Sequence, residues 1–349
     1  MSIKRRELLK IFGISAVSTP LISFFSHNAS YGTSPNIVIK PPPLRIGDTV
    51  GLISPAGMVD TEDIQKAKQT LANLGLKVKL GKHILDRYGY LAGKDIDRAA
   101  DVNNMFADKS VRAIIAMRGG WGCNRILPLL KYPLIRSHAK IIIGYSDITS
   151  LLLAINARSR IVTFHGPVAI SSWNKFTLDY LQPILFQGKM VSMTNPLTTE
   201  LRRRIINPGI ATGKLVGGNL SVVCAMVGSP YLPSWNRRIL FVEDIGEDIY
   251  RVDRMLTQLK NAGILSQLSG FIFGQCTRCS MGDDPSLTLM EVLNDHIKPL
   301  GIPAWYAAMI GHIRDKFTMP IGVNVEIDAN QGKISMLEPA VALEKMGKF

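Results

Sequence analysis

Cysteine and histidine are scarce in this chain of 349 residues, which contains four cysteines and six histidines. Cys276 and Cys279 form a single CxxC motif without a second pair or a nearby histidine, too little for a structural zinc site. We interpret it as an incidental pair rather than a catalytic dithiol, and whether the two thiols are oxidised stays open at this point. The sequence also has no Walker loop and no G-x-G-x-x-G motif, which disfavours nucleotide and dinucleotide binding. Nothing in the sequence therefore calls for a metal or a cofactor.

Acidic residues are outnumbered, 27 against 41 lysines and arginines, and the formal net charge is +14. Such an excess favours anionic surroundings such as nucleic acid, anionic lipid or an acidic cell-wall matrix. The basic residues are scattered, apart from Arg202–Arg204, and no basic patch interleaved with aromatics occurs. We therefore predict no nucleic-acid partner. With 46% apolar and 19% charged residues the composition is that of a globular protein, long enough for two domains.

A membrane-spanning hydrophobic run is missing near the start of the sequence. The apolar stretch Ile11–Phe25 is short for a span and is interrupted by Pro20. Lys4, Arg5 and Arg6 precede it, and adjacent arginines before a short apolar region resemble a twin-arginine export signal. We predict that residues 1–35 are this signal and that the protein is periplasmic or otherwise exported. No clean cleavage site follows, so association with the membrane through an uncleaved anchor stays an open alternative.

Strand-like and helical patterns alternate between residues 36 and 170. The expected strands cover residues 48–54, 76–80, 111–117, 141–143 and 161–164. This alternation predicts a mostly parallel sheet with helices on both faces, whose ligands bind at the carboxyl ends of the strands. Residues 171–211 are less regular and are predicted to connect this domain to a second unit at 212–349. That unit should close with an antiparallel pair at 323–328 and 333–337.

Ser146 lies where the apolar run Ile141–Ile143 and Gly144 give way to a second apolar stretch, at a predicted strand-to-helix turn. A hydroxyl there suits a nucleophile, although a plain helix N-cap is the alternative. The neighbourhood lacks the second glycine of the G-x-S-x-G motif, which disfavours an α/β-hydrolase. Gly119-Gly120 end another strand and could bring backbone N–H groups to a reacting carbonyl. We expect Cys123, just after this turn, to pack in the interior.

A serine nucleophile needs a base, and the base needs an acid that orients it. His165 follows a strand and His312 lies in a loop, and the sequence pattern does not choose between them. His27 is in the leader, and we expect the other histidines, His83, His138 and His296, at the surface. Glu243 is the strongest candidate acid because it ends a strand, whereas Glu247 and Asp248 suit the start of the next helix.

Six collinear blocks resemble bacterial LD-carboxypeptidases, also called muramoyltetrapeptide carboxypeptidases, a family that includes microcin C immunity peptidases. The blocks are RGGWGCNRILP (118–128), IIGYSDITSLL (142–152), HGP (165–167), GGNLS (217–221), FVEDIGEDIYRVDRMLTQL (241–259) and GHIRDKFTMPIG (311–322). The last block often reads G-H-G in relatives, whereas Ile313 follows His312 here. The resemblance covers nearly everything after about residue 43.

By this resemblance Ser146 is the nucleophile, Glu243 the acid and His312 the base, and the backbone N–H groups of Gly120 and Asp147 form the oxyanion hole. The implied fold is α/β, an N-terminal parallel-sheet domain plus a smaller C-terminal α/β domain with the active site in the cleft between them. A homodimer is also implied.

The resemblance further implies a serine carboxypeptidase that removes the terminal D-alanine from murein tetrapeptides. Export is predicted from the leader alone and departs from the family, in which many relatives are cytoplasmic. The substrate's free carboxylate needs a cation, for which Arg118 and Arg314 are candidates, although buried structural pairing is the stronger expectation for Arg118. Two alternatives remain open. One is a peptidase that hydrolyses a peptidyl-nucleotide antibiotic, and the other is a muropeptide-binding protein without activity.

Overall fold

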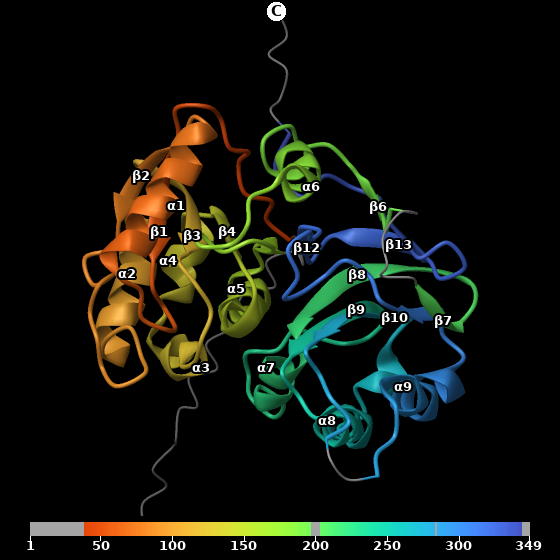
Figure 1. Cartoon of the computed structure of the whole chain (residues 1–349). Helices are drawn as coiled ribbons and strands as arrows, with labels where there is room; N and C mark the ends of the chain where they lie inside the picture. Colours follow the sequence, from red (N-terminus) through yellow and green to blue (C-terminus); the bar gives the residue numbers. More distant parts are fainter. Residues whose placement is uncertain (1–37, 197–202, 283–284, 344–349) are drawn as a thin grey trace, which may run out of the picture. The chain divides into compact units, whose positions relative to one another are not determined.

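The computed structural model describes residues 38–196, 203–282 and 285–343 (Figure 1). The predicted export signal at residues 1–35 lies outside this range. Within the described part of the chain, no helix combines the length and the apolar character that crossing a bilayer requires.

The first sheet has six strands and is parallel except at one edge. In spatial order it runs β12 (Met319–Ile321), β5 (Thr163–His165), β4 (Ile141–Gly144), β3 (Val111–Ala116), β1 (Thr49–Ile53) and β2 (Lys77–Leu80). Every residue of β4 is buried, as expected for a central strand covered on both faces. β12 pairs antiparallel with β5, so the C-terminal part of the chain completes the N-terminal sheet. The predicted parallel α/β arrangement is confirmed.

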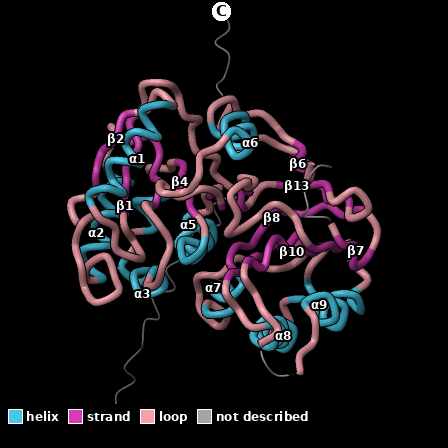
Figure 2. Tube along the Cα trace, in the orientation of Figure 1, coloured by secondary structure: helices cyan, strands magenta, loops and turns pink. Residues whose placement is uncertain are grey.

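Helices connect the strands of the first sheet. They are α1 (Thr61–Asn73), α2 (Asp95–Ala107), α3 (Cys123–Ile126), α4 (Tyr132–Ser137) and α5 (Thr149–Ser159), with the 3₁₀ turns η1 (Leu127–Leu129) and η2 (Ser146–Ile148). A capping box between Asp60 and Asp63 starts α1. Nearly all of α5 is buried because this helix contacts β4 on one side and β8 and α7 of the second half on the other (Figures 1 and 2).

The second sheet has eight strands, with a parallel centre and antiparallel edges. Its order is β6 (Ser192–Thr194), β14 (Lys333–Met336), β13 (Asn324–Asp328), β8 (Ile210–Asn219), β9 (Arg238–Ile245), β10 (Gly270–Thr277), β11 (Ala304–Tyr306) and β7 (Arg204–Asn207). Strands β8 to β11 are parallel. The predicted antiparallel pair at the end is β13 and β14.

The helices α7 (Leu220–Ala225), α8 (Ile249–Asn261) and α9 (Leu289–Ile297) accompany the second sheet. By contrast, α6 (Lys175–Leu185) lies against the first sheet, where Leu181 and Leu185 line a small cavity together with residues of β3 and β4. Two 3₁₀ turns, η3 (Leu265–Gln267) and η4 (Lys298–Leu300), follow α8 and α9. α8 buries one apolar stripe, Ile249, Val252, Leu256 and Leu259. Cys276 and Cys279, at the end of β10, are joined by a disulfide bond.

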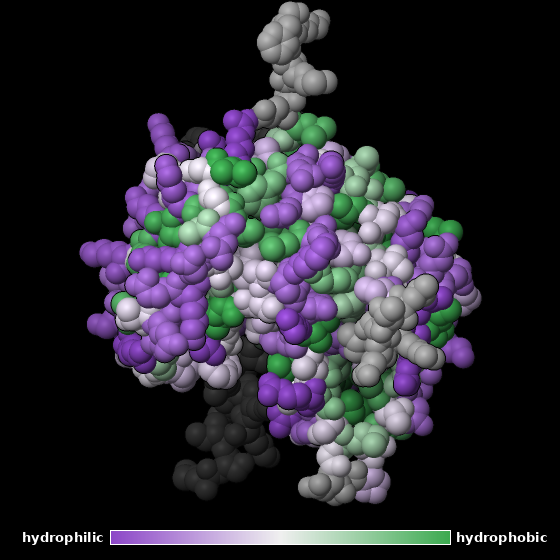
Figure 3. All heavy atoms as spheres, turned by 45° about the horizontal axis from the view of Figure 1, so that its top comes forward, coloured by the Kyte–Doolittle hydropathy of each residue, from purple (hydrophilic) through white to green (hydrophobic). Residues whose placement is uncertain are grey.

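Two stretches are more regular than the sequence pattern indicates. The segment 171–211, predicted as a connection, contains α6 and the edge strands β6 and β7. The apolar pattern of Leu215–Leu220 by itself indicates the opening of a helix, but strand β8 extends to Asn219 and α7 begins only at Leu220. Glycines at 217 and 218 mask the strand pattern. On the face drawn in Figure 3, hydrophilic and apolar side chains are interspersed.

Candidate active site

Ser146 occupies a tight turn between β4 and α5. Its backbone is left-handed, with φ of 64°, while the preceding Tyr145 is extended. A residue other than glycine rarely adopts this conformation, and a strained strand-to-helix turn is the hallmark of a nucleophile elbow. The turn therefore has the geometry of an elbow although the sequence lacks the G-x-S-x-G motif.

Gly144 and Ile148 explain how the elbow forms without the second glycine. A Cβ atom at position 144 would lie 2.8 Å from Cγ2 of Ile148, closer than such atoms approach. Ile148 is completely buried in the space that a side chain at 144 would need. The small residue two positions before the serine thus accommodates the large residue two positions after it, and a short serine-bearing turn results.

Glu243 and His312 form a hydrogen-bonded pair between β9 and the loop that joins β11 to β12. Nδ1 of His312 lies 2.7 Å from Oε2 of Glu243, which is completely buried. Burial acts to raise the pKa of Glu243, but His165 and His312 outweigh it, and the pKa falls below its usual range. An ionised carboxylate only accepts hydrogen bonds, so Nδ1 carries the proton and Nε2 is the nitrogen that can take one up.

Ser146 and His312 line the same cavity, which has a volume of about 230 Å³. Its lining residues are Arg118, Gly119, Gly120, Tyr145, Ser146, Val168, Ile170, Ser171 and His312. Among the described residues, the Ser146 hydroxyl has no hydrogen-bond partner. The structure therefore brings the predicted serine, acid and base to one site but leaves the contact between Ser146 and His312 open. Such contacts often tighten only when substrate binds.

The predicted oxyanion donors lie against Ser146. A Cβ atom at Gly119 would be 2.8 Å from the Ser146 Oγ and 3.4 Å from the Asp147 nitrogen, so only glycine allows this approach. The neighbouring Gly120 lines the cavity, and its N–H donates to no group in the described part of the chain. Asp147 lies in the first turn of η2, where an amide has no acceptor within the helix. Both amides can therefore donate to a ligand.

The Asp147 side chain joins the serine turn to the glycine turn. Its Oδ2 accepts a hydrogen bond of 2.8 Å from the Cys123 N–H, at the start of α3. The Cys123 side chain is completely buried, and burial raises the pKa of its thiol, so it packs in the interior as predicted.

Backbone and side-chain contacts hold the serine turn against the second sheet. The Asn219 N–H donates to Oγ1 of Thr149, the first residue of α5, over 3.0 Å. Asp244, next to Glu243, accepts from the Asn219 side chain and from the Ser221 N–H. Since Asn219 also pairs with Glu243 in the sheet register, this network places the acid relative to the serine helix.

His165, the other candidate base, lies behind Glu243. Its Nε2 is 3.7 Å from Oε1 of Glu243, the side chain is 2% exposed, and it is not among the cavity-lining residues. His312 therefore occupies the position that a base requires. Of the histidines predicted at the surface, His296 is buried instead, because its Nε2 lies 2.6 Å from Asp253 at the helix pair α8 and α9.

Tyr145 and Lys316 border the site but carry no signal in the sequence pattern. The Tyr145 ring meets the His312 ring edge-on, with centroids 4.8 Å apart. Nζ of Lys316 lies 4.3 Å from the centroid of the Tyr145 ring, and burial lowers the pKa of this lysine to about 8. The sequence offers one hint: Tyr145 directly precedes Ser146, and Lys316 follows His312 by four positions.

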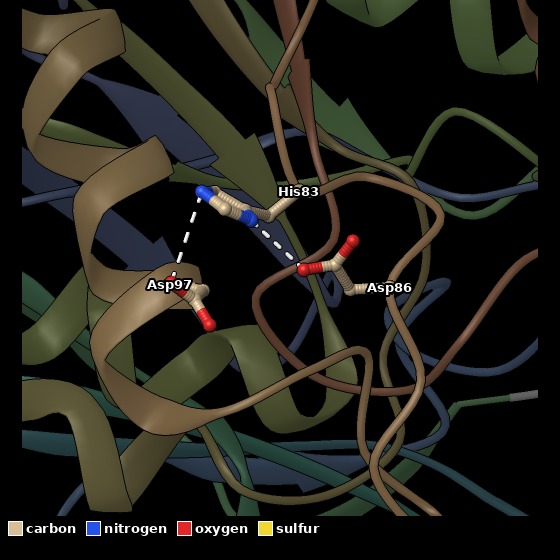
Figure 4. Close-up of side chains that lie close together, drawn as sticks. All are labelled: His83, Asp86 and Asp97. Carbon is tan, nitrogen blue, oxygen red and sulfur yellow. Dashed lines mark hydrogen bonds and ion pairs between the residues drawn. The ribbon is translucent and has the colours of Figure 1, made fainter.

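A second cluster of polar side chains, His83, Asp86 and Asp97, has the composition of a metal site (Figure 4). Nδ1 of His83 is 2.8 Å from Asp86, and Nε2 is 3.8 Å from Asp97. Each ring nitrogen thus faces a different carboxylate, whereas a metal would bind through one nitrogen. We interpret the cluster as a set of polar contacts of the first half, separate from the cavity.

Two family models match most of the chain. Residues 50–166 match the LD-carboxypeptidase N-terminal domain, and residues 212–327 match the LD-carboxypeptidase C-terminal domain. The chain belongs to the LD-carboxypeptidase family. It is therefore a member of a family of serine peptidases, as the sequence blocks predict.

Individual proteins that are similar to this chain support the assignment to the LD-carboxypeptidase family. A probable murein peptide carboxypeptidase of Bacillus subtilis is 39% identical over 313 residues, which cover 87% of this chain and 95% of the relative. Among solved structures, MccF in complex with glutamyl sulfamoyl guanosine is similar with a TM-score of 0.81 and 26% identity, covering 87% of this chain and all of that one. The muramoyltetrapeptide carboxypeptidase of Oxalobacter formigenes has a TM-score of 0.72 and 28% identity, covering 82% and 97%.

Proposed function

We propose that this protein is an exported serine LD-carboxypeptidase that removes the terminal D-alanine from murein tetrapeptides. The observation that carries the proposal is the Glu243–His312 hydrogen bond beside a cavity that Ser146 also lines. A serine in an elbow, a protonated Nδ1 facing a carboxylate and two unpaired N–H groups are the parts that acyl transfer needs. The relatives named as murein peptide and muramoyltetrapeptide carboxypeptidases favour this substrate.

In the acylation step, the Ser146 Oγ attacks the carbonyl carbon between the L-centre of the diamino acid and D-alanine. His312 Nε2 accepts the hydroxyl proton, and the N–H groups of Gly120 and Asp147 stabilise the negative oxygen of the tetrahedral intermediate. Glu243 remains ionised throughout and stabilises the imidazolium that forms on His312.

In the second half of the reaction, the C–N bond breaks and His312 donates its proton to the departing nitrogen of D-alanine. Water then attacks the ester on Ser146, and His312 accepts a proton from this water. As the ester bond breaks, His312 passes the proton to the Ser146 oxygen and the tripeptide is released. One peptide bond and one water molecule are consumed, so the atoms balance without a further reactant.

Export is the part of the proposal that depends on residues 1–35. The disulfide between Cys276 and Cys279 favours it, because such bonds persist in oxidising compartments. Residues 1–35 fused to a reporter should carry it across the inner membrane. Replacement of both Arg5 and Arg6 by lysine should then retain it in the cytoplasm if the signal is of the twin-arginine type.

Hydrolysis of a peptidyl nucleotide is the second candidate function. It is favoured by the similarity to MccF, a solved structure of which contains glutamyl sulfamoyl guanosine. A relative of this chain in Escherichia coli is named microcin C7 self-immunity protein MccF. The same acyl transfer could act on that class of compound because the serine, acid and base are indifferent to the leaving group.

Mass spectrometry separates the two functions. The purified protein is incubated in parallel with murein tetrapeptide and with a peptidyl-sulfamoyl nucleoside, and Ser146→Ala serves as the control. We expect loss of one alanine from the tetrapeptide only. Hydrolysis of the nucleoside conjugate alone would instead establish the second function, and no product from either would contradict both.

A further inference from the structure

Arg118 lies in the wall of the cavity that Ser146 and His312 line. Among the described residues that line this cavity, Arg118 is the single arginine or lysine. The leaving D-alanine carries the free C-terminal carboxylate of the peptide. A carboxypeptidase must recognise this carboxylate if it is to remove only the last residue. A guanidinium binds a carboxylate through two parallel hydrogen bonds, which adds direction to charge attraction.

The Arg118 guanidinium has no acidic partner in the described part of the chain. Its contact is a long hydrogen bond, 3.4 Å, from Nη1 to the Met58 carbonyl. The buried structural pairing that the sequence suggested for it is therefore wrong. Asp95 forms its ion pairs with Arg98 and Arg125. Arg118 is half-buried at the cavity wall, so its remaining N–H groups can bind a ligand.

The order of residues in the glycine turn fits the shape of the substrate. Gly119 lies against the Ser146 hydroxyl, and Gly120 supplies the proposed oxyanion donor. In a peptide, three bonds separate the attacked carbonyl carbon from the carboxylate carbon of the next residue, less than about 4 Å. Arg118 and Gly120 are two positions apart, so one short turn can contact both groups.

The other cations near the site are less suitable. Arg314, the second candidate from the sequence, is exposed and does not line the cavity. Lys316 is buried against the Tyr145 ring and does not line it either. Val168 and Ile170 provide an apolar wall for a methyl group.

We propose that Arg118 binds the C-terminal carboxylate of the leaving D-amino acid and thereby restricts cleavage to the last residue of the peptide. This inference rests on the proposed function and names the group that decides its specificity. It also distinguishes a carboxypeptidase from a peptidyl-nucleotide hydrolase, since the leaving group of the latter has no carboxylate in that position.

The test compares murein tetrapeptide with the same peptide carrying a C-terminal amide. kcat/KM is measured on both for the wild type, Arg118→Ala, Arg118→Lys and Arg314→Ala. We expect the wild type to prefer the free acid by about 10- to 100-fold, the range for a hydrogen-bonded charged group. Arg118→Ala should lose this preference by slowing cleavage of the acid alone, Arg118→Lys should retain part of it, and Arg314→Ala should match the wild type.

An acid-to-amide preference that survives in folded Arg118→Ala, verified by thermal unfolding, would overturn the inference while leaving the proposed function in place. A preference that is lost in Arg314→Ala would transfer the role to that residue. A wild type that releases alanine from neither peptide would contradict the proposed function itself.

Discussion

The turn that carries Ser146 and the loop that carries His312 differ in how their positions are set. The serine turn is made by consecutive elements, β4, η2 and α5, and its shape follows from the contact between Gly144 and Ile148. The His312 loop gains its position from Glu243 on β9 and from the Tyr145 ring of the other half. Removal of the Ser146 hydroxyl should therefore change chemistry alone, whereas substitution of Glu243, which holds the His312 loop, should change chemistry and stability together.

Ser146→Ala should have the largest effect and the simplest one. Without the nucleophile, D-alanine release should fall by about 10⁵-fold or more. The Ser146 side chain has no hydrogen bond in the described structure, so the free energy of unfolding should stay within about 0.5 kcal/mol. Muropeptide assays and urea unfolding measure the two quantities. Full activity in this variant would exclude Ser146 as the nucleophile.

Glu243→Gln should affect both quantities. The amide no longer holds the required His312 tautomer and charge, so turnover should fall by about 10⁴-fold. Because the Glu243 pKa lies below its ordinary value of 4.5, ionisation of Glu243 stabilises the fold above that pH, and the contribution is lost as the pH falls. In Glu243→Gln, the free energy of unfolding should therefore lose this dependence on pH below about pH 4.5. Unchanged turnover would instead assign the acid's role to Asp244.

Lys316→Met tests the border of the site through stability. Burial lowers the Lys316 pKa from 10.5 to about 8, so the folded protein binds this proton less tightly than the unfolded chain. The resulting cost is present below pH 8 and disappears as the pH rises to 10.5. We expect the substitution to raise the free energy of unfolding at pH 7 by about 1–3 kcal/mol, and the gain to shrink above pH 8.

Lys260 is exposed on α8, so Lys260→Met is the matched control for this experiment. It should change the free energy of unfolding by less than about 0.5 kcal/mol. Urea unfolding at pH 7 and pH 10 provides the measurement. Destabilisation of Lys316→Met at pH 7 would mean that the contact with Tyr145 outweighs the cost of burying the charge.

Cys123→Ala should have the smallest effect on catalysis. The thiol is buried and its pKa is raised, so it is not a nucleophile, and turnover should stay within about threefold of the wild type. A loss of turnover much larger than the loss of folded protein would revive a role for this cysteine.

The pattern of apolar runs was enough to locate most of the first sheet and its helices, because buried parallel strands and amphipathic helices have strong periodic signals. It failed where glycines interrupt a strand, as in β8, and in segment 171–211, whose edge strands are short. It also failed for His296, since an acid one helix away, Asp253, allows that ring to be buried.

By itself, the sequence determined the α/β class, the strand-end positions of Gly120 and Ser146, and the family to which the chain belongs. These depend on local periodicity and on motifs that are contiguous in the chain. The resemblance had already named His312 as the base, but only the tertiary structure decided that its ring, and not that of His165, lines the cavity, and that Arg118 has no acidic partner among the described residues. Those facts depend on contacts between residues far apart in the sequence, such as Glu243 and His312, and no local pattern encodes the distance between them.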